Sequence, residues 1–425
     1  MNRPPRLLFD VTFTRTQDAN VGITRTVRRL EEELGKLAPQ YGLAFVPVVF
    51  STRGFRVLSD KRSSPAEANA TPPGPGERLR LWITNGPIRR IVSLRFPLQI
   101  RWLAWSAFSW WEFNRLSRRM PMLDAGPGDI FFTCDASWSY RVWVASRLLR
   151  KRKAKVVTVV YDLIPLRQPQ YCTPLTVMAL RRWVRRQLPE SDAILCISRA
   201  VEDDLHQYAV ETGLKLPPVA NFRLGSDPIL RIDYTSQVRP AIRDFVEGGP
   251  CFTAIGSFEP RKNYGLLLNT FDRLWDRGID ARLLIIGRRN AQCGDLLERI
   301  DQHPEIGKRL LAVFDGSDEE VAFGYAKSRA LLFPSLAEGF GLPLVEARAR
   351  GCPVIASDLP AFRELADHGV SIFPLDSAQA LEGLIVSHLL DQHSPGPMAI
   401  FSWKDSAQSC MRYAELLLRK EAPSH

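Results

Sequence analysis

The sequence contains no long uninterrupted apolar run. No stretch of roughly 18 uncharged apolar residues occurs, so a helix that spans a membrane is not expected. The N-terminal residues MNRPPRLLFD hold only a very short apolar run before a charge, which is not the pattern of a secretory signal. Apolar residues form 45% and charged residues 24% of the 425 positions, as in soluble globular proteins, and this length allows two domains with separate cores.

Cysteine is scarce and shows no pairing pattern. The seven cysteines are scattered and odd in number, and neither a C-x-x-C pair nor a His/Cys spacing suited to zinc is present. Most of them are therefore expected to be small core residues. The expected compartment is the reducing cytoplasm.

Acidic residues are outnumbered, but only in the first half of the chain. The net charge is +11 overall. Residues 1–230 hold 35 basic and 20 acidic side chains, a net charge of +15, whereas the remainder holds 22 and 26, a net charge of −4. This asymmetry indicates that the two halves meet different partners.

Short apolar runs alternate with helical patterns in both halves. In the second half, the expected strands cover residues 251–258, 281–287, 310–315, 330–336 and 353–358. In the first half, they cover residues 6–13, 129–135, 155–163 and 192–198. The alternation predicts an α/β protein with two parallel, doubly wound sheets. Ser317 is an expected helix N-cap, and Gly278 and Gly351 are expected helix stops.

Two glutamates surround a Gly-Phe-Gly-Leu-Pro turn in the second half. Glu338 directly follows the expected strand 330–336, and Glu346 lies on the next helix. Ligands of doubly wound sheets bind beyond the carboxyl ends of the strands, and a carboxylate can accept both hydrogen bonds of a sugar diol. The backbone amides between the glutamates could meet an anion or sugar hydroxyls; they belong to Gly339, Phe340, Gly341 and Leu342. The alternative is that both glutamates are solvated surface residues.

A pair of cations follows the strand at 251–256. Arg261 and Lys262 lie within GSFEPRKN, at an expected strand-to-helix turn. Arginine offers a planar fork and lysine a compact charge, which together suit a diphosphate. Adjacent cations on a turn are more often plain surface residues, but the topology places these two on the same sheet edge as Glu338.

These segments together resemble a known family. The E-x7-E pattern of Glu338 and Glu346, with GSFEPRKN, DGSDEEV, a late FSW, NVGITRTVRRL and VVYDLIPL, is similar to retaining glycosyltransferases of GT-B fold. Bacterial mannosyltransferases that build surface polysaccharides resemble it most. The resemblance implies two Rossmann-like domains facing across a cleft, at 1–222 and 223–404, with a basic and aromatic insertion at about 60–120. It also implies a C-terminal helix, 405–425, that returns to the first domain.

The resemblance implies a role for each matching residue. Glu346 would bind the donor ribose, and Glu338 would contact the transferred sugar. Arg261 and Lys262 would neutralise the leaving diphosphate. Gly22 and Gly256 would line the donor, Gly22 by letting the backbone approach it. Asp162 would position acceptor or donor sugar, although Tyr161 stands where many relatives carry histidine; the alternative is a strand-end aspartate that bonds a loop backbone.

The implied function is transfer of a hexose, by preference mannose from GDP-mannose, to a glycan or lipid-linked acceptor with retention of configuration. A UDP- or dTDP-sugar donor, a sugar-nucleotide epimerase of similar fold, and a basic nucleic-acid-binding protein remain as alternatives. No recognised nucleic-acid motif is present, so no nucleic-acid partner is expected. No D-x-D triad suited to holding a metal on the diphosphate occurs, so neither an obligatory metal nor a cofactor is expected.

Residues 90–120 form a separate feature, with four tryptophans among many arginines. This composition suits an anionic membrane surface, with the rings at the headgroup level, and predicts a peripheral contact on the inner face of the cytoplasmic membrane. Core packing and single-stranded nucleic acid are the alternatives.

Overall fold

The computed structural model describes residues 3–16, 22–51, 54–58, 120–139, 142–226, 232–234, 237–375, 377–390, 395–399 and 401–419. The predicted basic and aromatic insertion at about 60–120, which includes the segment 90–120, therefore lies outside the described residues, apart from Met120. Within these ranges no helix combines the length and apolar character needed to cross a membrane.

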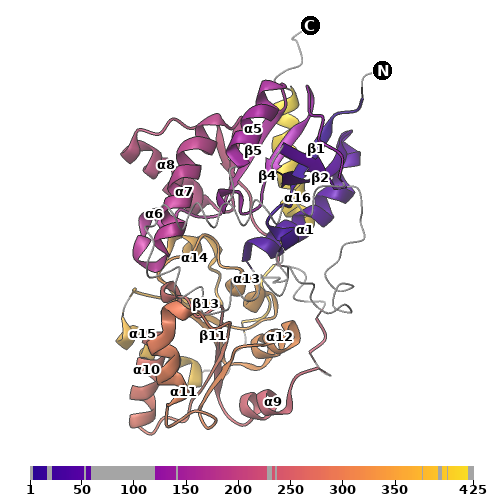
Figure 1. The fold of residues 1–425 in the computed structure, drawn as a ribbon. Coiled ribbons are helices and arrows are strands. Elements are labelled where there is room, and N and C mark those ends of the chain that lie inside the picture. The colour runs from indigo at the N-terminus through magenta and orange to yellow at the C-terminus, as the bar shows by residue number, and fades with distance from the viewer. Residues whose placement is uncertain are drawn as a thin grey trace, which may run out of the picture.

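The first sheet lies in the upper lobe of Figure 1 and has the strand order β3-β2-β1-β4-β5-β6-β7. Its strands are β1 (Arg6–Asp10), β2 (Ala44–Ser51), β3 (Gly54–Val57), β4 (Ile130–Thr133), β5 (Lys155–Val160), β6 (Ala193–Cys196) and β7 (Val219–Asn221). All pairs are parallel except β2 with β3. The chain order reverses between β1 and β4, which is the switch point where such sheets bind ligands.

The second sheet lies in the lower lobe, is parallel throughout, and has the order β10-β9-β8-β11-β12-β13. Its strands are β8 (Cys251–Ile255), β9 (Arg282–Ile286), β10 (Leu310–Val313), β11 (Ala330–Phe333), β12 (Val354–Ser357) and β13 (Val370–Phe373). Here the switch point lies between β8 and β11. The predicted fold class, two doubly wound Rossmann-like domains in the GT-B arrangement, is confirmed.

Helices cover the faces of both sheets (Figure 1). Those of the upper lobe are α1 (Gly22–Leu37), α5 (Val142–Lys151), α6 (Ile164–Arg167), α7 (Pro174–Gln187), α8 (Arg199–Thr212) and α16 (Trp403–Arg419). Those of the lower lobe are α9 (Pro240–Glu247), α10 (Tyr264–Asp276), α11 (Gly294–Asp301), α12 (Asp318–Lys327), α13 (Leu342–Ala349), α14 (Pro360–Leu365) and α15 (Ala378–Leu390). The last described helix, α16, packs against α1, so it lies in the lobe of the first sheet.

Local signals explain several helix ends. The Ser317 hydroxyl accepts the Glu320 amide at 3.2 Å, while the Glu320 carboxylate accepts the Ser317 amide at 3.0 Å, which is a capping box at the start of α12. Gly278 and Gly351 follow α10 and α13 with φ of +73° and +77°, a conformation that favours glycine after a helix. The predicted cap and the two predicted stops are confirmed.

The core is built mainly of the apolar residues of the strands and of the helix faces above them. One cluster of buried side chains extends from β1 and β5 through α16 to β11 and β12, so it joins the two lobes. Trp403, at the start of α16, is buried in this cluster and is a packing residue. The seven cysteines are all free, and five of them are buried.

Candidate functional site

A buried cluster of charges lies at the switch point of the second sheet. Arg261 and Lys262 occupy a short 3-10 helix, Pro260–Lys262, after β8, and Glu338 follows β11. The Lys262 ammonium donates to Glu338 Oε1 at 2.6 Å, and Arg261 Nη1 lies 2.7 Å from the same oxygen. The Ser335 hydroxyl also donates to this oxygen, at 2.8 Å. The structure therefore brings together the two predicted cations and one predicted carboxylate.

The charges in this cluster determine one another's protonation. Burial alone would raise the pKa of Glu338, but Arg261 and then Lys262 outweigh it and lower that pKa to about 2. Burial lowers the pKa of Lys262, against the opposing pull of Glu338. Arg261 also bonds Glu259, at 2.8 Å. Glu338 is thus a carboxylate that accepts hydrogen bonds at any pH near neutrality.

Asp162 reaches the same region from the other lobe. It follows β5 and lines a cavity of about 140 Å³ to which Arg261 contributes from the second domain. Burial raises the pKa of Asp162, and Arg261 opposes this shift. Its Oδ1 atom accepts the Ile164 amide at 3.0 Å, as a strand-end aspartate would. The predicted aspartate is therefore both a loop anchor and a wall of the cavity between the lobes.

The loop after Glu338 touches the first domain directly. A Cβ atom at Gly339 would lie 2.2 Å from the Tyr161 carbonyl oxygen, so only glycine allows this approach. The Ser198 hydroxyl donates to the Gly339 carbonyl oxygen at 2.7 Å. Nearby, the Glu364 carboxylate on α14 accepts the Arg199 amide at the start of α8, at 3.1 Å. These contacts place the carboxyl ends of β5 and β11 side by side.

Glu346 lies on α13, as predicted, and is buried with 3% of its surface exposed. One of its oxygens accepts the Tyr325 hydroxyl at 3.3 Å, and the other contacts the guanidinium of Arg25. Because Arg25 belongs to α1, this ion pair crosses from one domain to the other. The carboxylate expected to meet a ribose is therefore paired with a cation of the opposite lobe.

The remaining predicted donor residues occupy the ends of elements around these charges. Gly22 opens α1 with φ of +53°, and no atom lies within 4 Å of a Cβ built there. Gly256 follows β8 and accepts the Tyr264 hydroxyl at 2.9 Å. Phe340 is buried, and Gly341 and Leu342 form the N-terminus of α13. Their predicted contacts with a donor stay predictions.

Sequence reasoning missed the partners of the predicted residues. Arg25, Tyr325, Ser335 and Ser198 were not singled out, although each bonds a predicted carboxylate or its loop. Arg25 lies in the quoted NVGITRTVRRL segment, where three arginines occur within one and a half turns of helix. Among the described residues, no three His, Cys, Asp or Glu side chains are grouped so that they could hold a metal ion.

A pair of buried carboxylates lies at the switch point of the first sheet. Asp10 ends β1 and accepts the Thr12 amide at 3.0 Å, and Asp135 follows β4 and accepts the Thr14 amide at 2.7 Å. Burial and the charge of Asp135 raise the pKa of Asp10 to about 7. Burial also raises the pKa of Asp135.

This pair predicts that stability falls as the pH rises. An unfolded aspartate releases its proton near pH 3.8, whereas folded Asp10 keeps its proton up to about pH 7. The free energy of unfolding therefore falls as the pH rises through that interval, and it stays low above it. An asparagine side chain at this position cannot ionise. We therefore expect Asp10→Asn to gain about 2–4 kcal/mol relative to the parent between about pH 5 and pH 8. Urea unfolding at both pH values measures this gain, and parallel pH profiles for the two proteins would contradict it.

The sequence of this chain is similar to those of known glycosyltransferases. Residues 238–399 match a family model described as glycosyl transferases group 1. The serotype-specific mannosyltransferase WbdA of Escherichia coli is 32% identical over 276 residues, which are 62% of this chain and 34% of that protein. The O-antigen chain mannosyltransferase RfbU of Salmonella typhimurium is 26% identical over 252 residues, 58% of this chain and 68% of that protein. This chain thus spans about a third of the length of the first relative.

Among solved structures, sucrose-phosphate synthase from Thermosynechococcus elongatus aligns with a TM-score of 0.56, over 98% of this chain and 94% of that chain. The sequence identity is 16%, so this likeness concerns the fold.

Proposed function

We propose that this chain is a glycosyltransferase of polysaccharide biosynthesis, because residues 238–399 match the glycosyl transferases group 1 model and the whole chain has the GT-B fold. It would move a hexose from a nucleotide sugar to a hydroxyl of a glycan or lipid-linked acceptor. Similarity to mannosyltransferases of O-antigen synthesis supports mannose as the sugar and GDP-mannose as the preferred donor. A UDP- or dTDP-sugar remains the alternative donor.

One observation carries the proposal. Buried Lys262 and partly buried Arg261 converge with Glu338 on the carboxyl edge of the second sheet. That edge lies against Asp162 and the carboxyl edge of the first sheet, across the Gly339 contact. Arg261 and Asp162 line the cavity from opposite lobes, and Glu338, beside Arg261, also bonds Lys262. This arrangement of cations and carboxylates suits a sugar that bears a diphosphate and is held by its hydroxyls.

The same geometry supports a mechanism. Negative charge grows on the diphosphate as the glycosidic bond breaks, and Arg261 and Lys262 are already oriented by Glu338 and Glu259, so they can stabilise it without reorganising. Glu338 is ionised at neutral pH and can accept hydrogen bonds from hydroxyls of the transferred sugar. No carboxylate was singled out as a covalent nucleophile, so we propose attack from the face of the leaving group, with retention. Because the two side chains supply the positive charge, we propose that neither a metal nor a cofactor is required.

The location of the reaction is part of the proposal. The net charge of +15 in residues 1–230 supports a peripheral contact with anionic lipid at the inner face of the cytoplasmic membrane. The tryptophans that would enter the headgroup region lie outside the described residues, so their role stays a prediction.

A donor screen tests the proposal. We expect one nucleotide sugar to raise the melting temperature, since a ligand that binds only the folded state stabilises it. Adding that donor with a mannoside acceptor should release nucleoside diphosphate and yield a longer glycan whose new linkage keeps the anomeric configuration of the donor. A new sugar nucleotide formed from donor alone would instead identify an epimerase. Stabilisation by single-stranded nucleic acid, with none by any nucleotide sugar, would contradict the enzyme assignment.

A further inference from the structure

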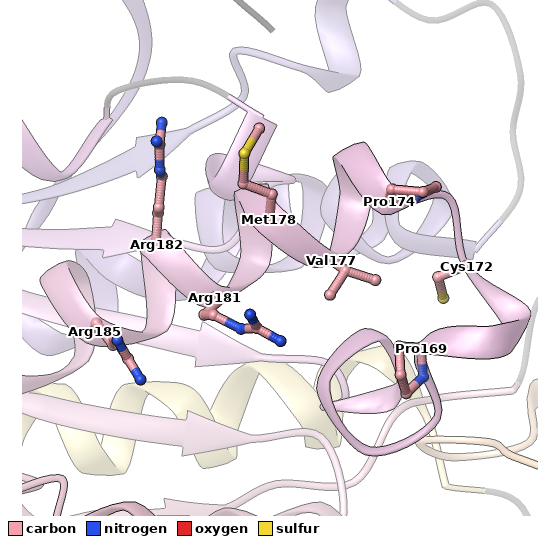
Figure 2. Close-up of a pocket in the computed structure, with 8 residues that line it drawn as sticks. All are labelled: Pro169, Cys172, Pro174, Val177, Met178, Arg181, Arg182 and Arg185. Carbon is pink, nitrogen blue, oxygen red and sulfur yellow. The ribbon is translucent and has the colours of Figure 1, made fainter. Parts of the chain in front are cut away.

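An open groove runs along α7, next to the cavity that holds Asp162 (Figure 2). Its volume is about 580 Å³. We name it the α7 groove, and it is lined by Pro169, Cys172, Pro174, Val177, Met178, Arg181, Arg182 and Arg185. Of these eight residues, Cys172 alone also lines the cavity that contains Asp162. A hollow of this size beside a catalytic cavity is large enough to hold part of a substrate.

The two ends of the α7 groove differ in chemistry. Prolines, Val177 and Met178 make one end apolar, and arginines make the other end basic. Arg181 and Arg185 are four residues apart, the spacing of one helical face. Figure 2 shows Arg181 and Arg185 extending to the same side of α7, while Arg182 extends away from them. Arg181 and Arg185 are therefore the pair that a single ligand in the groove could reach.

The charge of this pair is not neutralised within the described part of the chain. Two other arginines of the same domain each meet a carboxylate: Arg147 lies 2.7 Å from Glu190, and Arg167 lies 2.6 Å from Asp204. No described carboxylate lies within salt-bridge distance of Arg181 or Arg185, and both side chains are exposed. Two guanidinium groups that face one hollow without a counter-charge favour an anionic ligand.

The apolar end joins the groove to the catalytic cavity. Cys172 lines both hollows, and Thr176, on the first turn of α7, lines the cavity together with Asp162. Arg181 and Arg185 follow Thr176 by five and nine residues, which places them roughly 8 and 14 Å further along the helix axis. A ligand with a hydroxyl at Asp162 could therefore extend over the apolar end and reach the arginines with an anionic group.

We propose that the α7 groove binds a phosphate group of the acceptor, an inference that rests on the proposed glycosyltransferase function. The acceptor is then a saccharide joined to a phosphate ester, whose sugar end enters the cavity at Asp162. Arg181 and Arg185 hold the phosphate through bidentate hydrogen bonds, for which a guanidinium is suited. The apolar end packs against the carbon atoms of the sugar ring, which lies between the hydroxyl at Asp162 and the phosphate. The groove lining contains no aromatic side chain on which a nucleic-acid base could stack.

Binding of matched probes tests this proposal without requiring turnover. The probes are α-mannosyl octyl phosphate, octyl α-mannoside, and mannose 1-phosphate, each titrated by calorimetry into the full chain saturated with nucleoside diphosphate. We expect the phosphodiester to bind at least about tenfold more tightly than the neutral glycoside, since a hydrogen bond to a charged group contributes about that factor. Mannose 1-phosphate stands for a soluble phosphate source, and the octyl phosphodiester stands for a lipid-linked one, because only the phosphodiester carries both a phosphate and an alkyl chain.

Variants identify the residues involved. The double variant Arg181→Ala/Arg185→Ala should lose the preference for phosphate, whereas Arg186→Ala, an exposed arginine of α7 outside the groove lining, should retain it. Equal affinity for charged and neutral probes, or a preference that survives the double variant, would overturn the inference. Transfer to the neutral mannoside would then still support the proposed function. Conversely, a phosphate preference with no transfer to any probe would uphold the groove and count against the transferase.

Discussion

Lys262→Ala is expected to lower kcat/KM by about 10²–10³-fold, the usual loss when one donor that stabilises transition-state charge is removed. Lys262 is buried, its ammonium lies 2.6 Å from Glu338, and it sits 4.8 Å from the centre of the Phe333 ring. A cation in this buried position attracts a developing negative charge strongly. Water that enters the space left by alanine cannot replace the positive charge. Affinity for nucleoside diphosphate should fall by about tenfold or more.

The fold should survive this change. Glu338 keeps the Arg261 guanidinium at 2.7 Å and the Ser335 hydroxyl at 2.8 Å, so the substitution does not leave it as an unpaired buried charge. Lys308→Ala is the matched control, because Lys308 is an exposed lysine of the same domain beside the amino end of β10. Calorimetric titration with nucleoside diphosphate and initial-rate kinetics measure both effects. Unchanged diphosphate affinity in Lys262→Ala and in Arg261→Ala would place the diphosphate elsewhere.

Glu346→Gln and Arg25→Ala are expected to change nucleotide binding in different ways. The amide of glutamine still meets the Tyr325 hydroxyl, but it no longer offers a charged acceptor to a ribose diol. Affinity for nucleoside diphosphate should therefore fall by about tenfold to a hundredfold. Arg25 occupies the other oxygen of Glu346, so a ribose must share or displace it. Arg25→Ala should accordingly bind nucleoside diphosphate no more weakly than the parent.

Stability separates the two residues further. Arg25→Ala removes the cation of a buried pair that joins the domains, and breaking such a pair costs about 3–5 kcal/mol when the remaining charge is buried. Burial already lowers the pKa of Arg25, and its side chain is 22% exposed, so the loss should fall at or below the lower end of that range. Thermal unfolding without nucleotide measures the loss of stability, and thermal unfolding with nucleotide measures the change in nucleotide binding. Equal weakening of nucleotide binding in both variants would make Arg25 a ligand of the donor rather than a competitor for Glu346.

Much of the fold, and the charged residues at the strand ends of the second sheet, follow from local sequence patterns. The runs at 251–258 and 330–336 are apolar, short and bounded by turns, so they predict buried parallel strands whose carboxyl ends share one edge. The strands β8 and β11 lie there as adjacent neighbours. That adjacency brings Lys262 to Glu338 across 76 residues of sequence, and both residues could be selected because each lies in the loop that follows its strand.

Arg25, Asp10 and the α7 groove could not be selected in this way. Arg25 is one of three arginines in adjacent turns of α1, and only the approach of the second domain decides which of them faces Glu346. Asp10 and Asp135 become a coupled pair because β1 and β4 are neighbours at a switch point, although 125 residues of sequence, including those of a long insertion, separate them. Periodicity describes which side of a helix or strand is buried, whereas the identity of the partner depends on how distant elements pack. The sequence by itself therefore determined the two doubly wound domains and the residues at their strand ends. The tertiary structure alone decided which charges meet across the domains. Those contacts depend on packing between distant elements, which local patterns do not encode.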